Sequence, residues 1–256
     1  MGLLNTVAEF YLISIALSLT LFSIIARSEL TGNGFIKLIT NVSLGALVLA
    51  VVVNKLSGGH FASISMGLKY PSLVCLLLVT LFHKDYKTLE MWILWMMTII
   101  FTSFDIFFLS NLNWLHFLYL YSSALFLGII TYAMILGHWY LVVPKLSAHP
   151  LKIAAIITWI LLGAKFLFSL YTTYMNADFF SFENAENGSY AFNIILVSMR
   201  FIFGYVVIFI MSLFNWKLLQ LRSIQSSTGV LYAMTFFIFI GELISMYFYY
   251  KNGLML

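Results

Sequence analysis

The sequence is poor in charged residues, which make up 9% of its 256 positions, whereas hydrophobic residues make up 62%. In soluble domains about a quarter of the residues are charged. The mean hydropathy is +1.01, and the longest polar connection, residues 175–190, has only the length of a loop. These features exclude a soluble domain. We therefore expect a single transmembrane domain over residues 1–256 that contacts the lipid bilayer along its whole length.

Cysteine is scarce and the common catalytic motifs are missing. Cys75 is the single cysteine and lies inside an apolar segment, which excludes a disulfide or a thiolate metal cluster within the chain. We interpret it as a small buried side chain. The sequence has no glycine-rich phosphate loop, no HExxH or GxSxG motif, and no acidic pair of the type used by intramembrane proteases. These absences favour a protein that is not an enzyme, although chemistry on a lipid stays open.

Eight apolar segments, each long enough to cross a bilayer, are separated by short polar connections. The segments are approximately Val7–Ala26, Gly34–Asn54, Phe61–Phe82, Leu89–Leu109, Leu115–Val143, Leu151–Tyr174, Ala191–Trp216 and Val230–Tyr250. No basic region precedes the first segment and no small-residue cleavage site follows it, so we expect a retained span and not a signal peptide. The predicted fold is all-α: a polytopic bundle of about eight transmembrane helices in which sequence neighbours are antiparallel.

The basic residues at the span ends and in the connections are distributed unevenly if the connections alternate between the two sides of the membrane. Only Lys55 and Lys251 fall on one side. The other side holds Arg27, Lys37, Lys84, Lys87, Lys145, Lys152, Lys217 and Arg222. The positive-inside rule then places both termini on the outer side, and we expect a bacterial cytoplasmic (inner) membrane. Because these basic residues lie at helix ends, the net charge of +4 indicates orientation and not a nucleic-acid partner.

Five charged residues lie in the interior of the predicted spans, away from the span ends: Lys69, Asp105, Lys165, Arg200 and Glu242. Counted from the nearer helix ends, all five fall in the middle or outer half of the bilayer, so we expect them to share one layer. A charge in hydrocarbon is unfavourable unless it is paired. On a structural interpretation, Lys69 pairs with Asp105 and Arg200 with Glu242 to fix helix packing, while Lys165 extends outward.

On a functional interpretation, the same five residues form a ligand-binding cluster. Three cations against two carboxylates leave one positive charge, which an anionic ligand, a quinone headgroup or a displaced proton can balance. Lys69 is followed by Tyr70 and Pro71, and a proline in a helix frees a backbone carbonyl beside the lysine. Intramembrane ionisable residues more often mark function than packing, which favours this interpretation.

A weak internal symmetry accompanies these charges. When the eight segments are divided into two groups of four, the third helix of each group carries a cation, Lys69 or Arg200. The fourth carries an acid, Asp105 or Glu242. Both groups would have the same orientation, as in the parallel repeats of transporters. The pattern suggests a 4+4 parallel repeat, although four charges can adopt this order by chance.

The histidines allow a haem or metal site. The predicted topology puts His60 and His116 at outer helix ends, and His83 and His138 at inner ends. Bis-histidine haem ligation needs two ligands at one depth, which makes each of these two pairs a candidate. Residues 137–144, GHWYLVVP, form the most distinctive local string, in which a histidine lies between aromatic residues. An interfacial aromatic belt is the ordinary explanation for it, and a haem, metal or quinone contact is the alternative.

The leading functional hypothesis is a transporter, or a channel-like protein, for a small solute or ion. Arg200 and Lys165 would contact an anion, and Glu242 and Asp105 would act as counter-charges or proton carriers. The second hypothesis is a haem- or quinone-binding subunit of an electron-transfer complex. The third is a non-catalytic scaffold or assembly subunit that binds other membrane subunits. No cofactor is required by the leading hypothesis.

Overall fold

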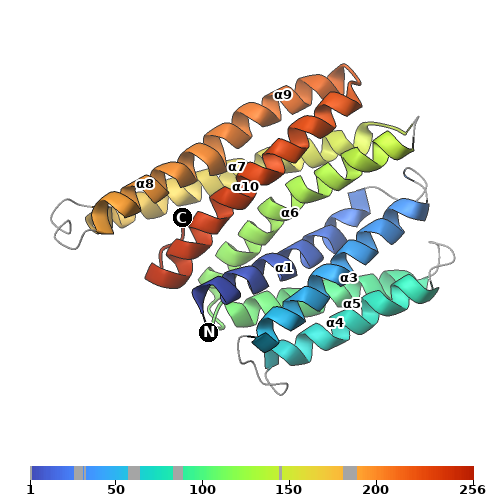
Figure 1. Ribbon diagram of the computed structural model, residues 1–256, viewed down its shortest axis with the longest axis horizontal. Helices are drawn as coiled ribbons and strands as arrows, with labels where there is room; N and C mark the ends of the chain where they lie inside the picture. Colours follow the sequence, from blue (N-terminus) through green and yellow to red (C-terminus); the bar gives the residue numbers. More distant parts are fainter. Residues whose placement is uncertain are drawn as a thin grey trace.

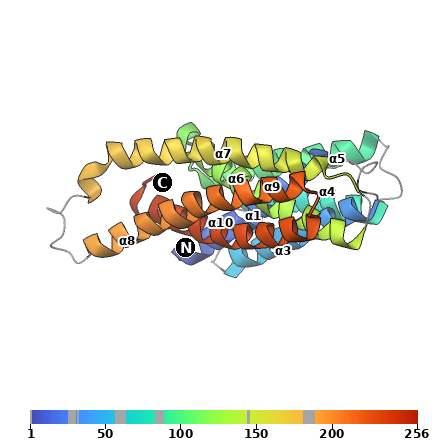
Figure 2. The ribbon, with the colours of Figure 1, turned by 90° about the horizontal axis from the view of Figure 1, so that it is seen from above.

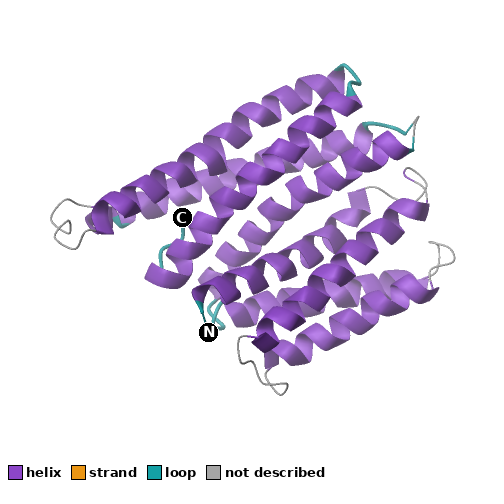
Figure 3. Ribbon diagram, in the orientation of Figure 1, coloured by secondary structure: helices purple, strands orange, loops and turns teal. Residues whose placement is uncertain are grey.

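The computed structural model describes residues 2–25, 31, 33–56, 64–82, 89–143, 146–180 and 189–256. Within these ranges every regular element is a helix, and the helices form a compact bundle (Figure 3). Seven helices are long and apolar enough to span a membrane, and Met66–Leu81 forms a shorter apolar helix. The predicted fold, an all-α polytopic membrane protein, is confirmed.

The helices follow the predicted apolar segments closely. Their bounds are α1 (Leu3–Phe22), η1 (Ser23–Ile25), α3 (Asn33–Leu56), α4 (Ile64–Phe82), α5 (Leu89–Leu109), α6 (Trp114–Val142), α7 (His149–Met175), η2 (Ala177–Phe180), α8 (Ser189–Phe201), η4 (Ile202–Val207), α9 (Ile208–Gln220) and α10 (Ile224–Asn252). The predicted segment Leu89–Leu109 matches α5 at both ends, and Ala191–Trp216 corresponds to α8, η4 and α9 in succession. Local capping fixes some boundaries: the Asn113 side chain accepts hydrogen bonds from the backbone of Leu115 and His116 at the start of α6.

Successive spans run in alternating directions, so the N- and C-termini lie at the same end of the bundle, here called the terminus end (Figure 1). Lys55 and Lys251 lie in the last turns of α3 and α10, at the terminus end. Lys37, Lys152 and Arg222 lie near helix ends on the opposite side. Arg27, Lys84, Lys87 and Lys145 fall outside the described residues. The alternation agrees with the sequence, while the side of the membrane that each end faces stays a prediction.

The spans are arranged as two rings of four helices. In the first ring α1 packs on α3, α3 on α4, α4 on α5, and α5 back on α1. In the second ring α6 packs on α7, α7 on α9, the α8–η4–α9 span on α10, and α10 back on α6. The two rings lie beside each other in Figure 1, and Figure 2 shows the elongated bundle from above, with α7 and α8 extending beyond the other helices at one end. Both halves therefore repeat one up-and-down arrangement.

The rings join where α1 crosses α6 at a close approach. A side chain at Gly128 of α6 would overlap Ser18 of α1, because a Cβ there would lie 1.9 Å from the Ser18 Cβ. The Ser18 hydroxyl also donates a hydrogen bond to the Ala124 carbonyl at 3.1 Å. Small residues with hydroxyl contacts are the usual means of tight helix packing in lipid, where apolar burial between helices contributes little. The α1–α6 crossing thus holds the two halves together.

The surface and the interior have the polarity expected in a bilayer. Large apolar side chains such as Leu167, Ile160 and Phe214 are exposed, whereas many charged and hydroxyl side chains, among them Arg200 and Glu242, are buried between the helices. A protein in water shows the opposite distribution, since charged residues there remain at the surface. The exposed apolar surface is the part of the protein that contacts lipid.

Two buried charged clusters as the candidate functional site

The first cluster lies inside the first ring, where four helices each contribute one polar side chain. Lys69 of α4 is its centre: the Nζ atom lies 2.7 Å from Oε1 of Glu9 in α1 and 3.0 Å from Oδ2 of Asp105 in α5. Asn54 of α3 donates from Nδ2 to Oε1 of Glu9 at 2.7 Å. All four side chains are almost completely buried. We call these four residues the first cluster.

The first cluster brings two carboxylates to one ammonium group, and its amide keeps an acceptor. The side-chain oxygen Oδ1 of Asn54 is buried and accepts no hydrogen bond from any described residue, although the amide nitrogen of the same group binds Glu9. A buried acceptor without a donor is unfavourable, so it indicates a position where a proton or another donor can be accommodated.

The second cluster lies inside the second ring, around Glu242 of α10. Oε1 of Glu242 lies 2.9 Å from Nη2 of Arg200 in α8, and Oε2 lies 3.7 Å from Nζ of Lys165 in α7. None of the three side chains is more than 2% exposed. Lys165 also donates to the Ser123 hydroxyl of α6 and lies 4.4 Å from the centre of the Tyr119 ring. We call Arg200, Lys165 and Glu242 the second cluster; it has one excess positive charge.

A tyrosine connects the second cluster to the neighbouring helix. Nη2 of Arg200 donates to the Tyr205 hydroxyl at 2.6 Å, and the guanidinium carbon lies 4.4 Å from the centre of the same ring. The Tyr205 hydroxyl is also within 2.5 Å of the Ser169 hydroxyl of α7. Nε and Nη1 of Arg200 are buried and donate to no described residue. Arg200 therefore keeps donors that can bind a further acceptor.

The position of Tyr205 depends on a π-helical segment. Residues 202–207 begin two positions after Arg200 and form η4, a π-helix within an otherwise α-helical span. In a regular α-helix residues five apart point in different directions, but the wider π turn brings them toward one face. Tyr205, five residues after Arg200, is thereby placed against the guanidinium group. Single π turns are rare and frequently occur at functional sites.

Two glycines bring the Arg200 and Glu242 helices close together. Gly204 in η4 crosses Gly241 in α10, so that a Cβ added to Gly241 would lie 2.5 Å from the Cα of Gly204. A Cβ added to Gly204 would lie 2.8 Å from Nη1 of Arg200. Backbone atoms cannot move away from such a contact as a flexible side chain can. Each glycine adjoins a site residue in the sequence, so the crossing sets the distance between Arg200 and Glu242.

The last residues of the chain lie over the terminus end of the second cluster. Gly253 ends α10 in a left-handed conformation with φ of 73°, which a glycine adopts without strain. The segment 253–256 then folds back, and Thr172 of α7 donates to the Met255 carbonyl at 2.6 Å. Tyr119 of α6 donates to the Leu256 carbonyl at 3.0 Å, and Ser245 of α10 donates to the same oxygen. This tail segment connects three helices of the second ring.

The structure confirms the predicted ion pairs and changes their grouping. Lys69 pairs with Asp105 and Arg200 with Glu242, as the sequence indicates. The five charges divide between two clusters, one in each ring, and Lys165 pairs with Glu242 instead of extending outward as the structural interpretation has it. The shared depth of the five residues in the membrane stays a prediction. Asp105 lies four residues from the terminus end of its helix, whereas Lys165 and Glu242 lie ten residues from theirs.

Sequence analysis missed Glu9 and Asn54, although both belong to predicted spans. Glu9 is the third residue of the first predicted segment and Asn54 is the last residue of the second. Their positions near segment ends suggest interfacial residues, but both are buried. An acid inside an apolar segment is the signal that identifies Glu9. With Glu9 included, the described residues of the two clusters comprise three buried cations and three buried carboxylates, divided unequally between the clusters.

The histidines do not form a ligand pair within the described part of the chain. His116 and His138 lie near opposite ends of α6, and each uses Nδ1 to contact a tyrosine hydroxyl: Tyr249 at 2.9 Å and Tyr232 at 3.1 Å. Among the described residues, no group of three histidine, cysteine, aspartate or glutamate side chains is arranged to hold a metal ion. His60 and His83, the other members of the predicted pairs, lie outside the described residues.

The string at residues 137–144 has structural contacts where the structure describes it. The indole nitrogen of Trp139 donates to the Thr31 carbonyl at 2.9 Å, and the Tyr140 hydroxyl donates to the Ser147 carbonyl at 2.8 Å. With the contact between His138 and Tyr232, these bonds connect the end of α6 to three other segments. The contacts agree with the interpretation as an interfacial belt.

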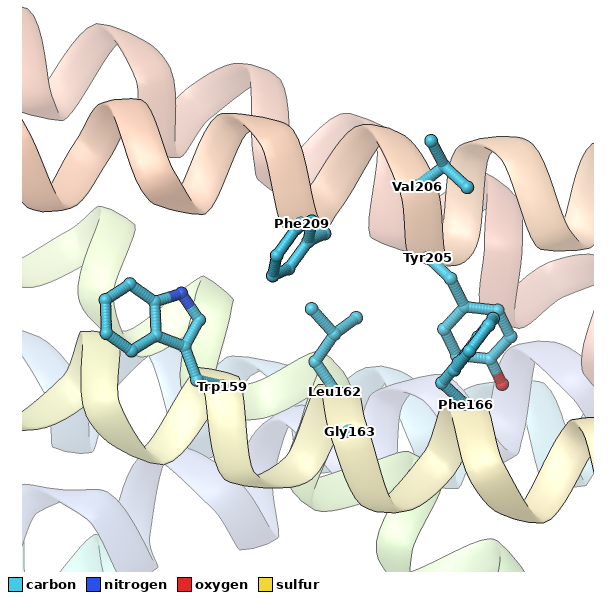
Figure 4. A pocket seen from close by; sticks show the side chains of 7 residues that line it. All are labelled: Trp159, Leu162, Gly163, Phe166, Tyr205, Val206 and Phe209. Atoms are coloured by element: carbon cyan, nitrogen blue, oxygen red, sulfur yellow. The ribbon is translucent and has the colours of Figure 1, made fainter.

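An apolar pocket of about 330 Å³ lies between α7 and the α8–η4–α9 span, beside the second cluster (Figure 4). Its walls are formed by Trp159, Leu162, Gly163, Phe166, Tyr205, Val206 and Phe209. Val206 and Phe209 are about half exposed, so the pocket opens on the lipid-facing surface. Figure 4 shows the Tyr205 ring at one end of the pocket and Trp159 at the other.

Comparison of the chain with protein-family models, with curated proteins and with solved structures finds no match.

Proposed function

We propose that this integral membrane protein transports a small anion and binds it at the second cluster. The observation that supports this proposal is the excess positive charge of Arg200, Lys165 and Glu242 in a buried position. An uncompensated charge in the membrane interior is unfavourable, and a monovalent anion would neutralise it. The free donors at Nε and Nη1 of Arg200 can form charge-assisted hydrogen bonds with such a ligand.

The mechanism depends on the unequal distances around Glu242. Its contact with Arg200 at 2.9 Å is close, whereas its contact with Lys165 at 3.7 Å is longer. An entering anion would displace the carboxylate from Lys165 while Glu242 stays paired with Arg200. Lys165 would keep its contacts with Ser123 and Tyr119 during the exchange. The π turn after Arg200 supplies a position where the helix can adjust.

The membrane orientation belongs to the same proposal. The terminus end would face outward. The opposite end, where Lys37, Lys152 and Arg222 lie, would face the cytoplasm of a bacterial cell. The tail segment, residues 253–256, would then cover the second cluster from the outer side. Release of this segment would open the route for the anion.

Arg200→Gln tests the function directly. Glutamine removes the positive charge but keeps a polar side chain, so the protein should still insert. We expect the uptake of radiolabelled acetate, formate, chloride and nitrate into proteoliposomes to fall by about 100-fold for the transported anions, since a charged hydrogen bond contributes about 2–3 kcal/mol. Lys152→Gln, at the end of α7 far from the cluster, is the matched control. A variant that inserts and takes up anions normally would overturn the proposal.

A charge swap separates transport from a scaffold role. Arg200→Glu combined with Glu242→Arg keeps an ion pair but moves the guanidinium group to α10, away from Tyr205. If the cluster only fixes helix packing, the double variant should regain the stability and function that each single variant loses. We expect stability to recover partly while uptake stays lost, because the anion needs the guanidinium group on α8, where Arg200 contacts Tyr205.

The apolar pocket favours a second candidate, a quinone-binding subunit of an electron-transfer complex. The pocket has aromatic walls, opens toward lipid, and ends at Tyr205, whose hydroxyl binds Arg200 (Figure 4). Quinones are apolar rings with polar oxygens, and such ligands bind in mostly apolar pockets with few polar groups.

Fluorescence of the pocket tryptophan tests this candidate. Addition of a short-chain ubiquinone to the purified protein should quench Trp159, and Phe209→Ala should weaken the quenching because it removes one wall of the pocket. Trp114, which lies near the start of α6, gives a control through Trp114→Phe. Equal quenching in the wild type and in Trp159→Phe would exclude the pocket as a quinone site.

A further inference from the structure

Asn41 is a polar residue that faces the lipid inside a membrane span. It is the ninth residue of α3, so it lies about 12 Å along the helix axis from the start of the span. Its side chain is exposed and makes no hydrogen bond with any described residue. Hydrocarbon offers neither donors nor acceptors, so an amide without a partner at this depth is unfavourable. Asn41 therefore indicates that a polar partner lies against the outer face of α3.

Gly45 lies one helical turn after Asn41, on the same face. It is exposed, and a Cβ added to it would meet no atom within 4 Å. The glycine therefore serves no close contact inside the chain, although glycine within a helix is less favourable than alanine. In membranes, small residues on a helix surface allow the backbone of another helix to approach closely. Gly45 leaves room for such a helix beside the Asn41 amide.

The exposed residues around Asn41 have the spacing of a helix–helix interface. Asn41, Gly45, Val48 and Val52 follow one another at intervals of four, three and four residues, and all four are exposed. Two helices that cross at about 20° pack along positions spaced in this way. Within the described residues α3 packs on α1 and α4, and these contacts leave the face uncovered on the outside of the bundle (Figure 1). We call these four residues the α3 face.

A second copy of this chain supplies the partner that Asn41 requires. An amide carries both donors and an acceptor, so two Asn41 side chains can satisfy each other. Two copies inserted in the same orientation are related by a twofold axis along the membrane normal, so their α3 helices run parallel. Both amides then lie at the same depth. A different protein would need a polar side chain at this depth by coincidence, which favours a second copy over another subunit.

Lys37 is the charged residue nearest to Asn41 along the α3 face. It lies one turn closer to the start of the helix and is exposed. In a pair of parallel α3 helices the two lysines would lie near each other at the membrane surface. The long side chain of lysine lets each ammonium group reach water away from the partner helix. The contact between two α3 faces therefore buries no pair of like charges.

From these observations we infer that two copies of this protein form a dimer through the α3 face, with Asn41 of one copy paired to Asn41 of the other. A single asparagine among apolar interface positions fixes both the register and the number of helices in such a pair. The inference does not rest on the proposed function, because it uses no residue of the second cluster. Each copy keeps both charged clusters inside its own rings.

Sedimentation equilibrium of the purified protein in detergent, at increasing dilution, tests the dimer. We expect Asn41→Leu to dimerise about 10-fold more weakly than wild type, because the amide pair is lost. Leucine is more favourable than asparagine in lipid, so this variant should insert and fold. Asn41→Gln keeps the amide and should keep most of the affinity. A wild-type protein that is monomeric throughout, or a dimer that Asn41→Leu does not weaken, would overturn the inference.

A matched pair of glycine substitutions tests the close approach. Gly45→Leu would hold two α3 helices apart, so we expect the dimer to dissociate. Gly163→Leu on α7 is the control, because Gly163 is also exposed and a Cβ there also meets no atom within 4 Å. This control should remain dimeric. If Gly45→Leu dimerises as tightly as wild type, or if both substitutions weaken the dimer equally, the α3 face is not the interface.

Disulfide cross-linking in the membrane locates the interface. Val48→Cys and Leu167→Cys are each combined with Cys75→Ala, which removes the single natural cysteine. Val48 on α3 and Leu167 on α7 are both exposed. Mild oxidation should join two copies of the Val48→Cys protein, because a disulfide requires Cβ atoms about 3.5–4.5 Å apart. The Leu167→Cys protein should stay uncrosslinked. Equal yields from the two proteins, or none from Val48→Cys, would contradict a dimer through the α3 face.

Discussion

At the scale of the residue, the contacts of each buried cation decide whether its charge is fully paired. Lys165 and Arg200 contact the same carboxylate. Only the Arg200 side chain is also hydrogen-bonded to a tyrosine and lies beside the crossing of Gly204 with Gly241. Lys165 is therefore the cation whose charge is in excess. A buried ion network that is only structural can often be replaced by apolar residues without loss of stability, and that substitution distinguishes packing from binding.

Lys165→Met should separate stability from function. Methionine is similar in length and apolar, and it leaves Arg200 and Glu242 as a neutral pair. We expect thermal unfolding in detergent to show unchanged stability or a gain of about 1–4 kcal/mol. Acetate binding should weaken by about 100-fold, since a charged contact is lost. A variant that binds acetate like wild type would show that Lys165 is not part of the site.

Tyr205→Phe tests the hydroxyl that supports Arg200. The change removes the contacts of this hydroxyl with Arg200 and Ser169 and leaves buried donors unpaired. We expect a loss of about 2 kcal/mol in the free energy of unfolding. Tyr232→Phe is the control, because its hydroxyl contacts His138 at an exposed position and should matter little. Equal effects of the two substitutions would contradict the role given to Tyr205.

These residues also show what can be predicted from the sequence. The ion pairs Lys69–Asp105 and Arg200–Glu242 could be predicted, because an isolated charge within an apolar segment requires a partner and few partners exist. The grouping could not, since depth along a helix does not reveal which helices are neighbours. Glu9 was missed because a carboxylate near a segment end is usually solvated.

At the scale of the element, irregular helix geometry builds the second cluster. The π turn at residues 202–207 and the crossing of Gly204 with Gly241 together determine where Arg200 meets Glu242. Apolar periodicity predicts the Ala191–Trp216 span but contains no signal for the extra residue in the turn. The helix bounds, in contrast, follow directly from the lengths of the apolar segments and from the short polar connections between them.

Gly241→Ala should disrupt the crossing. The added methyl group would lie 2.5 Å from the Cα of Gly204, so α10 must move away from η4. We expect the free energy of unfolding to fall by about 1–3 kcal/mol, as for other overpacked sites, and anion uptake to fall with it. Gly229→Ala in the same helix meets no atom within 4 Å and should be neutral or slightly stabilising. Thermal unfolding of both variants checks the comparison.

At the scale of the whole molecule, two four-helix rings each enclose one charged cluster. The rings have the same arrangement, and in each the cation of the third helix pairs with the acid of the fourth. This agreement supports the 4+4 parallel repeat that the sequence suggests. The two clusters differ in composition because the second helix carries Asn54 in one ring and Lys165 in the other, and because Glu9 has no acidic counterpart among the α6 residues of the second cluster.

Calorimetry of anion binding measures the charge of the second cluster most directly. Acetate is titrated into purified wild type, Arg200→Gln and the control Lys152→Gln. We expect wild type and Lys152→Gln to bind acetate alike and Arg200→Gln to bind it about 100-fold more weakly, because the anion loses a charge-assisted contact. Equal acetate binding by wild type and Arg200→Gln would contradict the proposal that the second cluster is the anion site.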